Sequence, residues 1–290
     1  AMAKVLINEP IAPDVFRMVV EAPDVTRYRK AGQFVIVRPA AGRERIPLTI
    51  ADADPKAGTI TLIYQVVGRT TAEMSLIEAG AQLNDIAGPL GQPTHIEKVG
   101  TVVMVGGGIG VAPSHPIAQA MKAAGNRVIT IMGARRKDLV IMEPEMRAAS
   151  DEVIVMTDDG SCGEKGFVTD ALKRLLDGGV KVDLVVAIGP PIMMKMVSLL
   201  TKGYGVHTLV SLNTIMVDGT GMCGGCRVTV GGETRFVCVD GPEFDGHLVD
   251  FDEMMRRQRT YVTAEKAYFD AFKAQHACRL EKAAKEAHHG

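Results

Sequence analysis

The chain has 290 residues, of which 47% are hydrophobic and 23% are charged, and its formal net charge is -1. This composition is typical of a folded globular protein and excludes a mainly disordered or fibrous chain. Because 33 lysines and arginines balance 34 aspartates and glutamates, no basic excess is available for nucleic acid or an anionic membrane surface, and neither partner is expected.

The first third of the chain, residues 1–97, is expected to form a small antiparallel β-barrel. Short runs rich in β-branched residues alternate apolar and polar side chains and are separated by turn residues. A helical pattern interrupts them only at Ala72–Glu78. The predicted strands are Lys4–Ile7, Val15–Glu21, Gln33–Pro39, Thr59–Gln65 and Gln82–Ala87.

From Gly100 the pattern changes to strand, glycine turn and helix, which predicts a parallel sheet covered by helices over residues 98–212. The predicted strands are Thr101–Val105, Arg127–Met132, Val153–Met156 and Leu184–Ile188. The predicted helices are Pro113–Ala124, Glu143–Ala149, Val168–Leu176 and Met193–Thr201.

A glycine- and cysteine-rich segment follows over residues 213–250, and a charged helical tail over residues 251–290. Thr263 is expected to cap the tail helix at its N-terminus. The helical spacing predicts one apolar face, made of Ala264, Tyr268, Ala271 and Phe272.

The strongest chemical signal lies in this third segment. Cys223 and Cys226 are separated by two residues, Cys238 follows after eleven more, and Asp218 stands five positions before Cys223. Plant-type two-iron clusters use C-x4-C-x2-C and a distant fourth cysteine, so the spacing fits with Asp218 at the first position. A carboxylate can ligate iron, although it is harder than thiolate. We predict a [2Fe-2S] cluster held by three thiolates and Asp218; the alternatives are a zinc site or unliganded buried thiols.

The remaining cysteines indicate no second site. Cys162 and Cys278 have no local partner and are expected to stay unliganded. No run of about 18 apolar residues occurs, the N-terminus lacks the plan of a signal peptide, and Ala1-Met2 is interpreted as a cloning scar. We therefore expect a cytoplasmic protein whose cysteines are thiols or metal ligands.

The second signal is the glycine turn Val105–Pro113, between a predicted strand and a predicted helix. Glycines admit a pyrophosphate close to the backbone, and the helix N-terminus favours the anion. The turn departs from the Rossmann fingerprint because Val111 replaces its third glycine, so a simple strand-to-helix turn is the alternative. Arg135, Arg136 and Lys137 follow the next strand, where they could meet the 2′-phosphate of NADP or form a solvated turn.

These signals together resemble a known family. The motifs Arg45–Ile50, Ala31–Val35, Val105–Pro113, Thr157–Ser161 and Gly189–Met194 are similar, in content and order, to those of ferredoxin reductase-like flavoproteins. The cysteine segment resembles that of the electron-transfer subunit of dihydroorotate dehydrogenase B and its relatives. With aspartate at position 218, residues 4–250 look most like the small subunits of NADH-dependent reduced ferredoxin:NADP oxidoreductases, also labelled sulfide dehydrogenase-like.

The resemblance implies a set of cofactor-binding residues. For FAD these are Arg45 at the phosphate, Pro47, Leu48 and Thr49 along the isoalloxazine ring, and Tyr64, Gly68, Thr70 and Thr71 around the rest. For NAD(H) they are Gly107, Gly108, Gly110, Pro113, Gly133, Arg135, Asp158, Asp159, Gly189 and Pro190. Two features differ from many reductases: no aromatic residue stands at Pro47–Leu48, and no terminal aromatic shields the flavin.

The implied function is electron transfer between NAD(H), FAD and the [2Fe-2S] cluster. A flavin can accept two electrons from NADH and release them singly to a cluster, so no side-chain acid or base is required. The resemblance favours NAD over NADP. It also implies a heterodimer with a larger iron–sulfur flavoprotein, and through it ferredoxin, in flavin-based electron bifurcation. The partner would contact the cluster segment and the helical tail, unless the tail packs on its own subunit.

Two alternatives remain open from the sequence. One is the electron-transfer subunit of a dihydroorotate or sulfide dehydrogenase; Asp218 counts against the dihydroorotate enzyme. The other is a regulatory module that binds a nucleotide and a metal without turnover.

Overall fold

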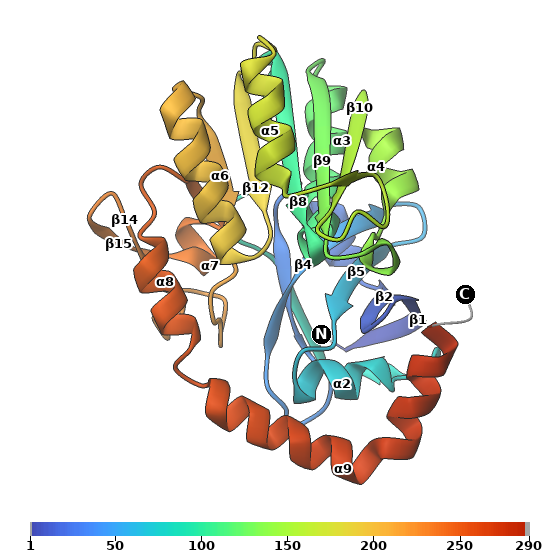
Figure 1. The fold of residues 1–290 in the computed structure, drawn as a ribbon. Helices are drawn as coiled ribbons and strands as arrows, with labels where there is room; N and C mark the ends of the chain where they lie inside the picture. Colours follow the sequence, from blue (N-terminus) through green and yellow to red (C-terminus); the bar gives the residue numbers. More distant parts are fainter. Residues whose placement is uncertain (1, 288–290) are drawn as a thin grey trace.

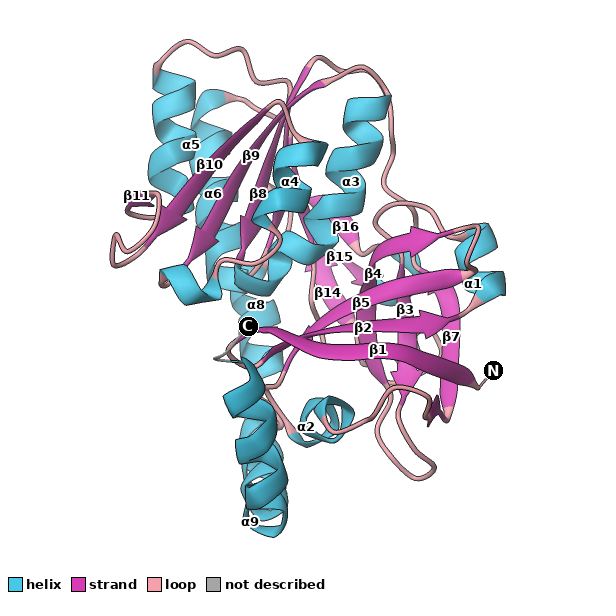
Figure 2. Ribbon diagram, turned by 90° about the vertical axis from the view of Figure 1, so that its right-hand side faces the viewer, coloured by secondary structure: helices cyan, strands magenta, loops and turns pink. Residues whose placement is uncertain are grey.

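The computed structural model describes the backbone of residues 2–287 and the side chains of residues 2–277. The N-terminal part is a near-closed antiparallel barrel with strand order β6-β1-β2-β5-β4-β3-β7 (Figures 1 and 2). Its strands are β1 (Ala3–Ala12), β2 (Val15–Glu21), β3 (Phe34–Arg38), β4 (Ile46–Asp54), β5 (Thr59–Gln65), β6 (Gln82–Leu83) and β7 (Asp85–Leu90). Two short helices, α1 (Pro23–Tyr28) and α2 (Arg69–Ser75), lie at its ends.

The predicted barrel is confirmed, although several of its elements differ from the prediction. Helix α1 was not predicted, and β6 and β7 stand where one strand, Gln82–Ala87, was expected. Alternating side chains such as Met18, Val35 and Leu62 fill its interior and are fully buried. Strand β4 was not among the predicted strands because Pro47 interrupts its β pattern, yet Pro47 lies opposite Ile36 of β3. Helix α2 begins three residues before the predicted Ala72, because Gly68 forms its N-cap.

The second sheet has strand order β11-β10-β9-β8-β12-β13-β16, and it is parallel except for β16. Its strands are β8 (Thr101–Gly107), β9 (Arg127–Ala134), β10 (Glu152–Thr157), β11 (Glu164–Lys165), β12 (Leu184–Ile188), β13 (Thr208–Ser211) and β16 (Glu243–Asp245). Its helices are α3 (Val111–Ala123), α4 (Glu143–Ala149), α5 (Val168–Asp177) and α6 (Pro191–Tyr204). Helices α3 and α4 cover one face, and α5 and α6 the other.

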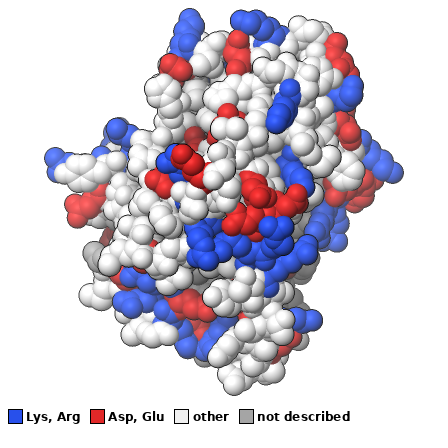
Figure 3. Space-filling view, turned by 90° about the vertical axis from the view of Figure 1, so that its left-hand side faces the viewer, with Lys and Arg blue, Asp and Glu red and all other residues white. Residues whose placement is uncertain are grey.

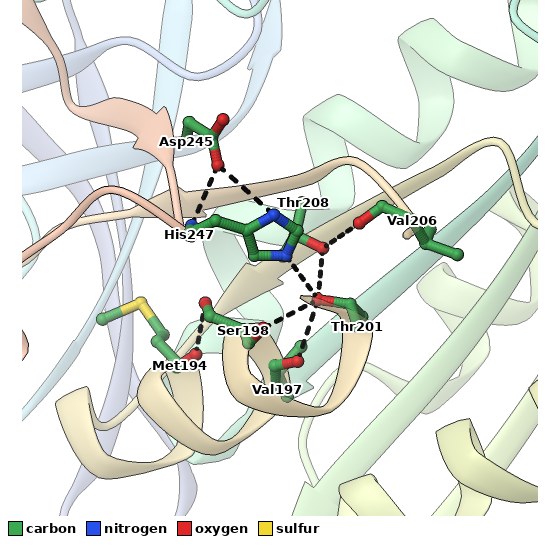
Figure 4. Close-up of polar contacts among 8 residues, drawn as sticks. All are labelled: Met194, Val197, Ser198, Thr201, Val206, Thr208, Asp245 and His247. Atoms are coloured by element: carbon green, nitrogen blue, oxygen red, sulfur yellow. Dashed lines mark hydrogen bonds and ion pairs between the residues drawn. The ribbon is translucent and has the colours of Figure 1, made fainter. Parts of the chain in front are cut away.

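The third segment is built into this sheet. It contains the hairpin β14 (Arg227–Val230) and β15 (Glu233–Phe236), the short helix α7 (Val237–Asp240), and β16, which pairs with β13. A buried polar network ties the chain after β16 to α6 (Figure 4): the Thr208 hydroxyl donates to Thr201 Oγ1 at 2.6 Å, and His247 Nε2 lies 3.0 Å from the same oxygen. The cysteine-containing segment 213–250 is therefore fixed against the second sheet.

The tail forms α8 (Phe251–Gln258) and the long helix α9 (Val262–Ala287), which packs against β1 and α2 of its own chain (Figure 1). The Thr263 cap is wrong, since Thr263 lies inside α9. Of the predicted apolar face, Phe272 is buried, stacking on His276 at 4.2 Å, whereas Tyr268 is exposed. The side chain of Cys278 lies outside the described residues. No described helix is long and apolar enough to cross a membrane.

A partly buried carboxyl group lies where β16 meets the connection between the two sheets. Thr94 donates a hydrogen bond to Glu243 at 2.5 Å, and burial raises the pKa of Glu243 to about 7. In the folded protein Glu243 stays protonated at pH values at which a glutamate of the unfolded chain is already ionised. The stability that Glu243 contributes should therefore fall as the pH rises from about 5 through 7.

Glu243→Gln should remove this pH dependence. The neutral amide carries no ionisation cost, so the variant should gain stability relative to the wild type as pH rises, by about 3 kcal/mol in total. Melting temperatures of both proteins between pH 5 and 8 measure the difference. Parallel curves for the two proteins would show that Glu243 does not titrate in this window.

Candidate functional site

A crevice of about 1070 Å³ lies between the barrel and the second sheet. It brings together 14 of the 18 residues that the sequence predicted for the cofactors. These are Pro47, Leu48, Thr49, Tyr64, Thr71, Gly107, Gly108, Gly110, Pro113, Gly133, Arg135, Asp158, Gly189 and Pro190. Arg45, Gly68, Thr70 and Asp159 lie outside its lining. The crevice therefore joins the barrel motif and the glycine turn in one space.

On the barrel side, β4 presents Pro47, Leu48 and Thr49 to the crevice. Strand β3 fixes their register, since Phe34 pairs with Thr49. Phe34 lines the crevice as well, although the sequence analysis did not include it. These side chains form a wall that is mostly apolar and suits one face of a flat aromatic ring.

Arg45 stands just before this wall and has an incomplete set of partners. Its Nη1 lies 3.4 Å from Asp85 Oδ2, while its buried Nε atom has no hydrogen-bond partner. A buried donor without a partner is rare in native proteins and indicates a missing acceptor. An anionic group such as a phosphate would satisfy it.

The hydroxyl groups of α2 and Tyr64 already have partners. Thr70 donates to Glu44 at 2.7 Å, and Thr71 accepts from the Gly68 N–H at 3.1 Å. Tyr64 donates to Asn8 at 2.9 Å, and burial raises its pKa far above the usual range. Tyr64 can therefore offer its ring to the crevice, while its hydroxyl proton is already donated to Asn8.

On the opposite side, the glycine turn connects β8 to α3. A side chain at Gly110 would collide with the carbonyl group of Ile188, the last residue of β12, and one at Gly107 would collide with Met193 of α6. A Cβ at Gly108 would meet no atom within 4 Å. Because these glycines have no side chains, the ends of β8 and β12 can pack together. The start of α3 stays open to the crevice, where its N–H groups favour an anion.

Of the three cations after β9, Arg136 is neutralised by an ion pair. Arg136 forms two hydrogen bonds with Asp138, both at 2.9 Å, and Ser161 donates to Asp159 at 2.6 Å. The Ser161 hydroxyl, with its backbone N–H, lowers the pKa of Asp159 and keeps it ionised. Arg135 is the residue of this group that lines the crevice together with Asp158.

The predicted cluster ligands come together as two pairs. Cys226 and Cys238 are buried with their sulfur atoms 3.3 Å apart, and Cys223 Sγ lies 3.5 Å from Asp218 Oδ1. Among the described side chains, no group of three or more His, Cys, Asp or Glu could hold a single metal ion. Two pairs fit a two-iron cluster, in which each iron takes two protein ligands, better than a single zinc ion, which needs four converging ligands.

Backbone hydrogen bonds favour the ionised form of Asp218. The N–H groups of Thr220, Met222 and Cys223 donate to its carboxylate at 3.0–3.1 Å, and they lower its pKa. Burial and the neighbouring Cys226 thiol raise the pKa of Cys238. The positive charge of a bound metal centre would favour the thiolate form.

The sequence analysis missed the segment that connects the crevice to the cluster loop. Ser211, Leu212, Asn213, Thr214 and Met216 line the crevice and precede Asp218 by a few residues. This segment mixes polar and apolar residues and contains none of the motifs that indicated a cofactor site. Their contribution depends on the pairing of β13 with β16, which brings this segment beside the barrel.

Comparison with known proteins identifies two parts of the chain. Residues 104–199 match the oxidoreductase NAD-binding domain, and residues 213–250 match the iron–sulfur cluster binding domain of dihydroorotate dehydrogenase B. The second match contains all four predicted cluster ligands.

Relatives cover nearly the whole chain. A Thermotoga maritima protein named dihydroorotate dehydrogenase B (NAD(+)), electron transfer subunit homolog, is 48% identical over 272 residues, which span 94% of this chain and 96% of that protein. The Fusobacterium nucleatum protein named dihydroorotate dehydrogenase B (NAD(+)), electron transfer subunit, is 36% identical, over 82% of this chain and 93% of its own.

Solved structures give the same fold. The structure of an NADH-dependent reduced ferredoxin-NADP oxidoreductase, described for flavin-based electron bifurcation, matches with a TM-score of 0.89 and 46% identity, over 94% of this chain and 98% of the matched chain. The ferredoxin reductase of carbazole 1,9a-dioxygenase matches with a TM-score of 0.60 at 20% identity, over 71% and 65%, and shares the fold alone.

These findings confirm the family and the cofactors inferred from the motifs. The chain belongs to the family of the electron transfer subunit of dihydroorotate dehydrogenase B and its homologues, oxidoreductase subunits that use FAD, an iron–sulfur cluster and NAD(H).

Proposed function

We propose that the chain is the small subunit of an NADH-dependent reduced ferredoxin:NADP oxidoreductase. The observation that carries this proposal is the match to such an enzyme over 94% of the chain at 46% identity. A crevice shared by the barrel and the glycine turn, lined also by the segment 211–216 that leads to the cluster loop, supports the same conclusion.

The barrel side of the crevice would hold FAD. Arg45, with its unpartnered Nε, would bind the phosphate, and Pro47, Leu48 and Thr49 would pack along the isoalloxazine ring. The flavin supplies the conversion between a two-electron hydride and single electrons. The protein has to bring the nicotinamide and the ring together in the same crevice, since hydride transfer needs close and aligned contact.

The second sheet would hold the nicotinamide nucleotide. The open backbone at Gly108 and the α3 N-terminus would receive its pyrophosphate, while Gly189 and Pro190, which also line the crevice, would border the nicotinamide end. Asp218, Cys223, Cys226 and Cys238 would hold the cluster as two pairs of ligands. No side chain is needed as an acid or base.

The cluster loop is suited to contact a partner subunit. Met222 beside Cys223 is 88% exposed, and Val217 and Leu248 are more than half exposed. The face with α6, α8 and the hairpin carries acidic and basic side chains side by side (Figure 3), including the Lys195–Asp252 ion pair at 2.7 Å. We propose that a larger iron–sulfur flavoprotein covers the loop and receives the electrons.

A tagged chain purified from its host tests this function. It should bring down a larger flavoprotein, and the complex, but not the isolated chain, should reduce NADP with NADH and reduced ferredoxin. Full activity of the isolated chain would contradict the proposal. The second candidate is the dihydroorotate dehydrogenase B subunit, which the names of the relatives favour; oxidation of dihydroorotate by the complex would establish it instead.

Asp138→Asn should strengthen the binding of NADPH relative to that of NADH. The residues after the second strand of such a sheet read the ribose 2′ position, and Asp138 now neutralises Arg136. Release of this arginine should tighten NADPH binding about tenfold, since a charge-assisted hydrogen bond contributes about 1.5–3 kcal/mol. Titration of the flavin-loaded chain with each nucleotide measures this change.

The double variant Arg136→Gln/Asp138→Asn is the control. It should lose the gain in NADPH affinity and keep NADH affinity. A gain that persists without Arg136 would assign selectivity to another group.

A further inference from the structure

Two buried side-chain polar atoms lack a hydrogen-bond partner in the part of the chain whose side chains are described. One is Arg45 Nε, at a residue that the sequence already assigned to FAD, and the other is the Thr214 hydroxyl oxygen. Thr214 lines the same crevice. Buried polar groups without a partner are rare, so the pair indicates two places where a ligand completes the site.

Thr214 lies on a segment that is attached to the barrel side of the crevice. The Leu212 N–H donates to the Pro242 carbonyl at 2.9 Å. Pro242 and Phe34 both pack against Gly91, so closely that a Cβ there would lie 3.0 Å from Pro242 Cδ and 2.8 Å from Phe34 Cε1. Phe34 in turn pairs with Thr49. The segment that carries Thr214 is thus connected, through Pro242 and Phe34, to the strands that form the proposed wall along the flavin ring.

The same segment leads directly to the cluster loop. Met216, two residues later, is 8% exposed and packs in one apolar cluster with Phe34, Ile36 and Cys226. Gly219 of the cluster loop is packed against Ile36 and Leu90 of the barrel. A ligand contact at Thr214 would therefore be made from a rigid connection between the crevice and the cluster ligands.

We propose that the Thr214 hydroxyl hydrogen-bonds to the polar edge of the FAD isoalloxazine ring and positions this ring relative to the cluster loop. That edge carries carbonyl oxygens and ring nitrogens, and a threonine hydroxyl can both donate and accept. Pro47, Leu48 and Phe34 provide no side-chain hydrogen bond to the ring edge, so Thr49 is the one residue of the wall with a side-chain hydroxyl group. This inference rests on the proposed flavin site.

Thr214→Val tests the assignment, because valine keeps the shape and removes the hydroxyl group. The FAD dissociation constant of the full chain, from flavin fluorescence on dilution, should rise about tenfold, equivalent to about 1.4 kcal/mol. The visible absorption bands of the bound flavin should shift as well. Thr214→Ser keeps the hydroxyl group and should stay within about twofold of the wild type.

Wild-type affinity and an unchanged flavin spectrum in Thr214→Val would overturn the assignment, as would a serine variant as weak as the valine variant. Thr214→Ala carries the same prediction, so the test holds even where the valine variant fails to fold. A wild-type chain that binds no FAD would remove the proposed flavin site itself, whereas normal binding by Thr214→Val would remove only this contact.

Discussion

Replacing Cys226 with serine should leave the protein without its iron–sulfur cluster. Cys226 is 1% exposed, and its sulfur lies 3.3 Å from that of Cys238. A serine hydroxyl does not ionise readily, so one iron would lose half of its protein ligands. Iron and acid-labile sulfide should fall from about two of each per chain to near zero, with loss of the cluster EPR signal. FAD content should remain, since the flavin wall is on the barrel.

Cys162→Ser is the matched control for this variant. Cys162 is a half-buried thiol in the turn after β10, and its backbone N–H and C=O bond to the Thr157 hydroxyl group. Its replacement should leave iron, sulfide and FAD unchanged. A Cys226→Ser protein with full iron content would contradict the ligand assignment, as would loss of iron in the control.

Gly110→Ala should damage the nucleotide side of the crevice more than any other single methyl group. The new Cβ would lie 2.6 Å from the Ile188 carbonyl carbon and 2.8 Å from Gly189 Cα, and neither is a flexible side chain. The φ angle of -64° at Gly110 suits alanine, so the effect is steric alone. We expect a stability loss of about 3 kcal/mol and loss of NADH binding, measured by melting temperature and by flavin reduction.

Gly203→Ala provides the comparison for this effect. Gly203 lies inside α6, and a Cβ there would meet no atom within 4 Å. Alanine is favoured over glycine within helices by about 1 kcal/mol. This variant should therefore bind NADH normally and melt at or above the wild-type temperature. A Gly110→Ala protein that behaved in the same way would show that the strand ends do not pack as described.

Local patterns in the sequence predicted most of the fold. Alternation gave the barrel, and the strand–glycine–helix rhythm gave the parallel sheet. Strand β4 escaped because Pro47 has no N–H and breaks the local pattern, whereas in the fold β3 and β5 hold it from both sides. Strand β16 was not predicted because three residues are too few to show the alternation of a strand. Its pairing with β13 also joins segments that are about 35 residues apart.

Some residues of the candidate site could likewise be predicted from local sequence patterns, and others could not. Glycine and cysteine spacing is local, so Gly108, Gly110 and the four proposed cluster ligands could be named from the sequence. The roles of Phe34 and Thr214 depend on contacts between β3, β13 and β16, which no local pattern contains. Tyr64 lines the crevice as expected, but its hydroxyl group binds Asn8, 56 positions away in the chain.

The most direct test of the central claim, electron transfer from NADH through FAD to a two-iron cluster, is a titration of the anaerobically purified chain. Flavin, iron and sulfide are assayed first, and NADH is then added while flavin absorbance and the cluster EPR signal are followed. We predict about one FAD and about two each of iron and sulfide per chain, with flavin bleaching by NADH and appearance of the reduced-cluster signal. Zinc in place of iron, or a flavin that does not respond to NADH, would contradict the account.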